Sequence, residues 1–157
     1  MKLSTRARYG LRALIDLGLY GEEEAVSIQC IADRQQISDS YLEQLMAKLK
    51  KAGLVVSSRG ASGGYRLGKP AREISVGEIL RVLEGSLEAV ECPGNSEEEG
   101  TGCRQADFCV SRIVWKRIND AIRQAVDTLM LSQLIEESRK LQEEVGGNKK
   151  EQEWPCC

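Results

Sequence analysis

The pattern of apolar residues changes abruptly at Gly53, and this change limits the possible folds more than any other feature of the chain. The segment before it has apolar residues at the i, i+3, i+4 and i+7 positions of one helix face, namely Leu42, Leu45, Met46 and Leu49. The segment after it reads as two short extended runs, residues 54–58 and 65–67, separated by a glycine-rich stretch. A helix that leads directly into such a hairpin predicts a winged helix, a mainly α fold with a small β-hairpin wing.

Two further helices are expected before this one. The first begins near Ser4 and ends around Tyr20. Ser27 is a suitable N-cap for a short second helix, after which residues 35–38 turn the chain. Two short helices joined by such a turn are typical of a helix-turn-helix.

Two pairs of residues have the spacing of a capping box. Ser40 and Glu43 would begin the third helix, and Ser75 and Glu78 would begin a helix behind the wing. With these helices, the sequence predicts a winged helix-turn-helix DNA-binding domain over residues 1–85.

A long helix is expected from about Ala106 onward. Its apolar stripe is too long for so small a domain to cover, so we expect it to pack against its copy in a homodimer, with burial on the chain's own core as the alternative. The residues assigned to the dimer contact are Val114, Ile118, Ile122 and Ala125. The other segments expected are a cysteine-bearing loop over 86–109, dimerisation helices over 110–145 and a disordered tail over 146–157.

Composition and charge exclude several classes of protein. Of the 157 residues 41% are hydrophobic, yet no apolar run is long enough for a signal segment or a bilayer span, so we expect a cytoplasmic protein with no membrane contact. Residues 1–70 carry 11 Lys and Arg against 7 Asp and Glu, which suits a DNA-facing half. The chain has no histidine, no phosphate loop and no paired nucleophile and base. We therefore expect neither an enzyme nor a small-molecule substrate.

The residues expected to face DNA lie on the third helix and on the wing. Polar side chains off the apolar stripe are free to reach base edges, and an arginine at the wing tip suits a narrow minor groove. Glu43 could accept from cytosine, although its place in the capping box is an alternative role. The predicted contacts are Ser38, Ser40, Tyr41, Glu43, Gln44, Lys48, Arg59, Ser62, Gly63, Gly64 and Tyr65.

Three cysteines, Cys92, Cys103 and Cys109, lie in the polar loop before the long helix. Clustered cysteines in a chain expected to be intracellular are more often metal ligands or redox centres than disulfides. Thiolates suit an iron–sulfur cluster and zinc alike, and bare redox thiols are a third possibility. Asp107 is a weak candidate for an additional oxygen ligand.

The other cysteines have simpler interpretations. Cys30 is expected to be a small buried residue of the second helix. Cys156 and Cys157 fall in the tail.

Three segments, together with the three cysteines, resemble the Rrf2-type winged-helix regulators, a family that includes the IscR, NsrR, RirA and CymR groups. These segments are MKLSTRARYGLRAL at 1–14, ISDSYLEQL at 37–45 and RGASGGYRL at 59–67. The resemblance implies a homodimeric transcription factor that binds a palindromic operator in double-stranded DNA. It also implies an iron–sulfur cluster held by Cys92, Cys103 and Cys109, with [2Fe-2S] favoured over [4Fe-4S] by likeness to the IscR group.

The chain departs from the family pattern at the fourth cluster ligand. The IscR group has a histidine shortly after the last cysteine, where this chain reads Val110, Ser111 and Arg112. The NsrR group has an acidic residue near the N-terminus, where this chain has Arg8. The fourth ligand therefore stays open, as do two alternative functions: a CymR-like regulator controlled by a partner protein of cysteine metabolism, and a thiol- or zinc-based redox sensor.

Overall fold

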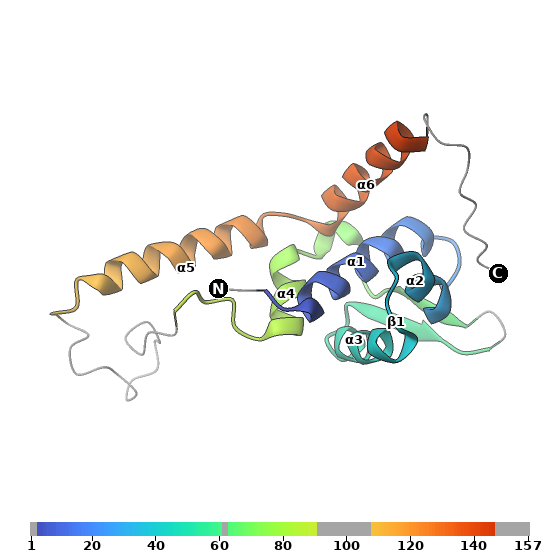
Figure 1. Cartoon of the computed structure of the whole chain (residues 1–157), viewed down its shortest axis with the longest axis horizontal. Helices are drawn as coiled ribbons and strands as arrows, with labels where there is room; N and C mark the ends of the chain where they lie inside the picture. Colours follow the sequence, from blue (N-terminus) through green and yellow to red (C-terminus); the bar gives the residue numbers. More distant parts are fainter. Residues whose placement is uncertain (1–2, 61–62, 91–107, 147–157) are drawn as a thin grey trace.

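The computed structural model describes residues 3–60, 63–90 and 108–146 (Figure 1). In chain order the elements are α1 (Thr5–Tyr20), α2 (Ile28–Gln35), α3 (Asp39–Lys51), β1 (Val55–Ser58), β2 (Gly64–Leu67), a 3-10 turn η1 (Ala71–Glu73), α4 (Val76–Glu84), α5 (Ser111–Asp127) and α6 (Leu131–Gly146). This arrangement confirms the predicted mainly α fold with one small hairpin wing.

Helix α1 lies at the centre of the core and packs against α2, α3, α4, α6 and β2. Its Leu14 and Leu17 are fully buried. Two glycines on α1 allow neighbouring helices to approach closely, because a Cβ at Gly10 would overlap Leu83 of α4 and a Cβ at Gly18 would overlap Ile135 of α6. These five elements are therefore positioned by their packing on α1.

Helices α2 and α3 form the helix-turn-helix. The Ser27 hydroxyl accepts a hydrogen bond from the Cys30 amide at 3.2 Å, so this N-cap is confirmed. Helix α2 ends at Gln36, whose φ of 53° is left-handed, and the chain then passes through Ile37 to Ser38, the N-cap of α3.

The predicted capping box at Ser40 and Glu43 is wrong. Helix α3 begins two residues earlier, and the Leu42 amide already donates to the Ser38 carbonyl at 3.0 Å. Because the helical hydrogen bonds satisfy the amides from Leu42 onward, a hydroxyl at position 40 has no free amide to cap. The side chains of Ser40 and Glu43 are both exposed.

The wing is an antiparallel pair in which Val55 lies opposite Leu67 and Ser58 lies opposite Gly64. It is fastened to the segment before α2, because Val26 and Tyr65 exchange backbone hydrogen bonds of 2.9 and 2.8 Å. A Cβ at Gly64 would overlap the Val26 carbonyl, so this close approach requires glycine.

The second capping prediction holds in part. The Ser75 hydroxyl caps α4 by accepting from the Glu78 amide at 3.1 Å, whereas the Glu78 carboxylate binds Lys69 at 2.8 Å and does not return to Ser75. Gly85, with φ 89°, ends the helix.

Helices α5 and α6 are joined by a link that is held on the body. The Val76 amide donates to the Leu129 carbonyl at 2.8 Å, and the Leu131 amide donates to the Ile74 carbonyl at the same distance. From this link α5 extends away from the body, while α6 lies along α1 (Figure 1). No helix in the part of the chain that the structure describes is long and apolar enough to cross a bilayer.

Candidate DNA-binding surface and cysteine site

The outer face of α3 carries polar side chains that its packing leaves free. The buried face is made by Leu42, Leu45, Met46 and Leu49, so the side chains between them point away from the core. The exposed members of the predicted DNA-contact set are Ser38, Ser40, Glu43, Gln44 and Lys48. Such a row of donors and acceptors on one helix face is suited to reading base edges in a major groove.

Tyr41 differs from the rest of this set because it is half-buried. Its ring packs edge-on against Tyr9 of α1, with the ring centroids 6.1 Å apart. The guanidinium groups of Arg8 and Arg12 lie 5.9 and 5.6 Å from the centre of the Tyr9 ring. Through the two tyrosines, Arg8 and Arg12 of α1 lie near the first turn of α3. The sequence did not predict this, although the i, i+4 spacing of the two arginines indicates that they share one face of α1.

The wing presents two exposed arginines, Arg59 directly after β1 and Arg66 on β2. Arg66 Nη2 donates to the Glu23 carbonyl at 2.6 Å, so Arg59 is the one at the wing tip for which the structure shows no such tie to another described residue.

Three other predicted contacts on the wing are half-buried: Gly63, Gly64 and Tyr65. Gly64 and Tyr65 form the contact with Val26, so both have a structural role in the wing, independent of any contact with DNA. Ser62 lies outside the described residues.

Basic groups also gather at the end of α3, where they face the negative end of the helix dipole. They are Lys48, Lys50 and Lys51. The Lys50 ammonium donates to the Ser57 hydroxyl at 2.5 Å, which ties the end of α3 to the wing. Of these three lysines, only Lys48 was predicted from the sequence to contact DNA.

Of the three clustered cysteines, only Cys109 lies in the described part of the chain; Cys92, Cys103 and Asp107 lie outside it. Cys109 is half-buried and stands two residues before α5. The Ser111 hydroxyl is 3.0 Å from its sulfur, and this hydrogen bond, with the Arg112 amide, holds the pKa of the Cys109 thiol below its usual value. A stabilised thiolate is the form that ligates metals.

Within the described ranges, no three Cys, Asp or Glu side chains come together as a metal site. Cys30 is buried in the core, as the sequence predicted.

The residues of the apolar stripe predicted on α5 share one helix face but differ in burial. Ile122 is half-buried and packs with Val76, Leu80 and Leu87 on the chain's own body. The other three residues of the predicted dimer contact are exposed: Val114, Ile118 and Ala125. Val114 is 50% and Ile118 37% exposed, so this part of the α5 face is apolar surface that the chain itself does not cover.

A family profile described as an iron-dependent transcriptional regulator, Rrf2, matches residues 3–137. The chain belongs to the Rrf2 family. This confirms the resemblance seen in the sequence, and the relatives are transcriptional regulators of that family, so the prediction that the chain is not an enzyme is confirmed as well.

Among its relatives, the HTH-type transcriptional regulator IscR of Pectobacterium carotovorum is 38% identical over 135 residues, which cover 86% of this chain and 79% of that protein. Protein rrf2 of Nitratidesulfovibrio vulgaris is 41% identical over 138 residues, covering 88% of this chain and 89% of that protein.

Two solved structures are similar over most of their length. IscR of T. potens is 39% identical with a TM-score of 0.71, and the match covers 90% of this Rrf2 chain and 91% of the T. potens chain. CymR, the global cysteine regulator of B. subtilis, is 40% identical with the same TM-score, and the match covers 87% of this chain and 97% of CymR. Similarity of this order extends to both IscR and CymR, so it does not separate these two groups.

The exposed position of Arg59 gives a first test of the surface. Arg59→Ala should weaken binding to a selected operator by about 1–3 kcal/mol, because the lost guanidinium would read base edges or a narrow minor groove. The measurement is a DNA titration at two salt concentrations, with Arg72→Ala as control, since Arg72 is an equally exposed arginine on η1, an element that packs against α6. Unchanged affinity of the Arg59 variant at both salts would remove this residue from the contact surface.

Proposed function

We propose that this Rrf2 regulator binds a palindromic operator as a homodimer and that an iron–sulfur cluster held by Cys92, Cys103 and Cys109 controls its affinity for DNA. The observation that carries the DNA-binding part is the pairing of an exposed polar face on α3 with an exposed arginine on the adjacent wing. A cytoplasmic location follows from this role, since a regulator acts where the chromosome is.

The homodimer is supported by the uncovered apolar face of α5. A two-fold pair places the same face of both copies in contact, so the patch that contains Val114 and Ile118 would pack against the same patch of the other copy. The two DNA-reading helices would then be held at a fixed spacing, which is what a palindromic operator requires.

The cluster is supported by the chemistry of its donors. Cys109 has a thiol whose pKa is lowered, and the IscR relatives suggest an iron–sulfur cluster in the family. Our preference for [2Fe-2S] over [4Fe-4S] rests on the resemblance of the sequence to the IscR group. When bound, the cluster would supply a group that responds to oxygen, nitric oxide or iron–sulfur supply. Without histidine in the chain, the fourth ligand would be an oxygen, a solvent molecule or another thiol, with Asp107 a weak candidate.

The position of Cys109 suggests how the signal reaches the DNA-binding surface. This residue stands two positions before α5, the helix assigned to the dimer contact. A change at its sulfur would therefore act at the start of α5 and alter the spacing of the two reading helices.

A second candidate function follows from the equally good match to CymR. In that case a protein of cysteine metabolism would control DNA binding, and the cysteines would not hold a cluster. Absorption of protein purified without oxygen separates the two, because only a cluster gives bands between about 320 and 600 nm.

The dimer is tested by Ile118→Glu. A carboxylate in the middle of an apolar contact is costly to bury, so this variant should sediment as a monomer and lose operator binding at the same time. Lys116→Glu is the matched control, because position 116 lies across the helix from Ile118 and is already charged. An Ile118→Glu protein that stays dimeric would place the two-fold contact elsewhere.

The cluster is tested by single replacements of the cysteines. Cys92→Ala, Cys103→Ala and Cys109→Ala should each abolish the visible absorption, whereas Cys30→Ala, Cys156→Ala and Cys157→Ala should retain it. Mössbauer spectra of the anaerobic protein would decide between [2Fe-2S] and [4Fe-4S]. A triple Cys92, Cys103 and Cys109 variant with a full complement of iron and sulfide would overturn the assignment.

A further inference from the structure

The last residue of α2, Gln35, is held by hydrogen bonds from two residues of α1. Its amide nitrogen donates to the Asp16 carboxylate at 2.9 Å. Its amide oxygen accepts from Arg12 Nε at 3.0 Å, and its backbone carbonyl accepts from Arg12 Nη2 at 2.9 Å. A carboxylate only accepts and a guanidinium only donates, so these partners fix the orientation of the Gln35 amide.

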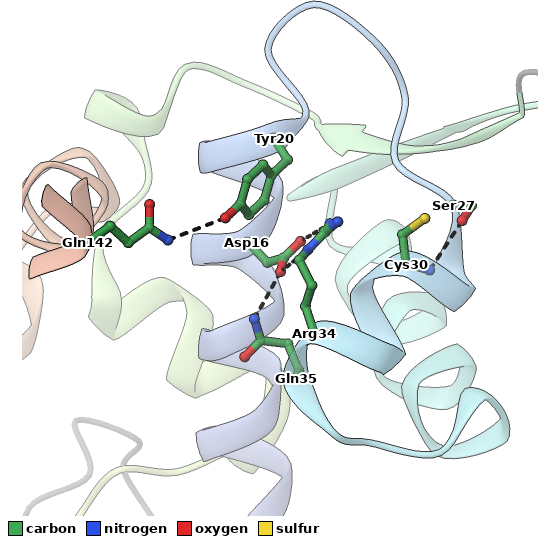
Figure 2. Close-up of polar contacts among 7 residues, drawn as sticks. All are labelled: Asp16, Tyr20, Ser27, Cys30, Arg34, Gln35 and Gln142. Atoms are coloured by element: carbon green, nitrogen blue, oxygen red, sulfur yellow. Dashed lines mark hydrogen bonds and ion pairs between the residues drawn. The ribbon is translucent and has the colours of Figure 1, made fainter. Parts of the chain in front are cut away.

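Asp16 is itself rigidly placed. It is 1% exposed, and Arg34 of α2 binds both of its oxygens at 2.6 and 2.9 Å (Figure 2). The Arg34 guanidinium also stacks over the Tyr20 ring, 4.3 Å from its centre. A bidentate pair of this kind is geometrically specific, so the carboxylate presents a fixed acceptor to Gln35.

Gln35 lies close in sequence to the start of α3, so contacts that hold Gln35 also affect the position of α3. Only Gln36, Ile37 and Ser38 separate it from the first residue of α3. Gln36 is in the left-handed conformation, and the Ile37 amide donates back to the Ala32 carbonyl at 3.0 Å, so the turn has little freedom. A shift of the end of α2 is therefore passed on to the start of the recognition helix.

We propose that Gln35, held by Arg12 and Asp16, is a positioning residue that sets the orientation of α3 and thereby the sequence specificity of the protein. This inference rests on the proposed role of α3 in reading DNA. Gln35 acts without touching DNA itself.

Specific and non-specific binding depend differently on such an orientation. Hydrogen bonds to base edges need good geometry, whereas attraction to phosphates is tolerant of small shifts. Loss of the Gln35 contacts should therefore reduce specific binding and leave non-specific binding and its salt dependence unchanged.

Gln35→Met is the direct test, because it removes the amide with little change in volume and none in charge. Its affinity for an operator selected by the wild-type protein should fall about tenfold or more, which a loss on the order of 1.4 kcal/mol would produce. Affinity for a random duplex should stay within about twofold of wild type. Gln29→Met is the matched control, since Gln29 is an exposed residue of the same helix for which the structure shows no side-chain hydrogen bond.

A second variant separates positioning from direct contact with phosphate. Arg12 is exposed, so Arg12→Met is not expected to unfold the protein. If Arg12 acts through Gln35, this variant reduces specific binding as Gln35→Met does, and the double variant is no weaker than either single one. If Arg12 instead binds phosphate, non-specific binding falls and the slope of log affinity against log salt decreases by about 1, which would contradict the inference.

Amide chemical shifts of residues 37–42 provide a readout that does not involve DNA. They should move in both the Gln35 and the Arg12 variants and stay unchanged in Gln29→Met. If the wild-type protein selects no DNA sequence, the proposed function itself is contradicted. Wild-type protein that selects an operator, together with a Gln35→Met variant that binds it equally well, would overturn this inference alone.

Discussion

The packing of α1 against α2, α3, α4, α6 and β2 is the constraint on which the rest of the structure depends. Leu14 and Leu17 occupy the middle of the core, and the glycines at positions 10 and 18 let α4 and α6 approach the helix closely. The same helix holds the end of α2 by hydrogen bonds of Arg12 and Asp16 with Gln35. The reading helix α3, strand β2 of the wing and α6 thus all pack on one helix, so a change in the packing of any of them affects α1.

This arrangement keeps the two proposed surfaces of the protein apart. The polar face of α3 and Arg59 of the wing belong to the body, whereas the uncovered apolar face lies on α5, which extends away from it (Figure 1). Ile122 and Val126 pack α5 against the body, whereas Val114 and Ile118, nearer the start of the helix, are exposed. A second copy on that face would therefore not compete with DNA for the same residues.

Helix caps and turns were predictable from the sequence where they depend only on residues close together in the chain. The cap at Ser27 and the hairpin after Gly53 depend on residues close in sequence, and both are found. The start of α3 was not predictable in this way, because Ser38 and Ser40 are both good N-cap residues and the choice depends on how Ile37 and Leu42 pack. Periodicity also could not say which residues of α5 face the body, since Ile122 and Ile118 are equally apolar.

Long-range polar contacts could not be predicted from the sequence. Asp16 lies between core positions of α1, which was the only signal of its burial, and its partners are 18 and 19 residues away. No local pattern connects such residues, so a polar network that joins two helices becomes visible only in the fold. The cysteine site stays a prediction because two of its three cysteines lie outside the described residues.

The central claim is that a cluster on the cysteines controls the affinity for DNA. Its most direct test is the operator affinity of anaerobic protein measured with the cluster in place and after its removal, at one salt concentration. We expect the two affinities to differ by about tenfold or more, a coupling of ordinary allosteric size. The difference should disappear when Cys92, Cys103 and Cys109 are all replaced. Equal affinities for the two forms would contradict the claim.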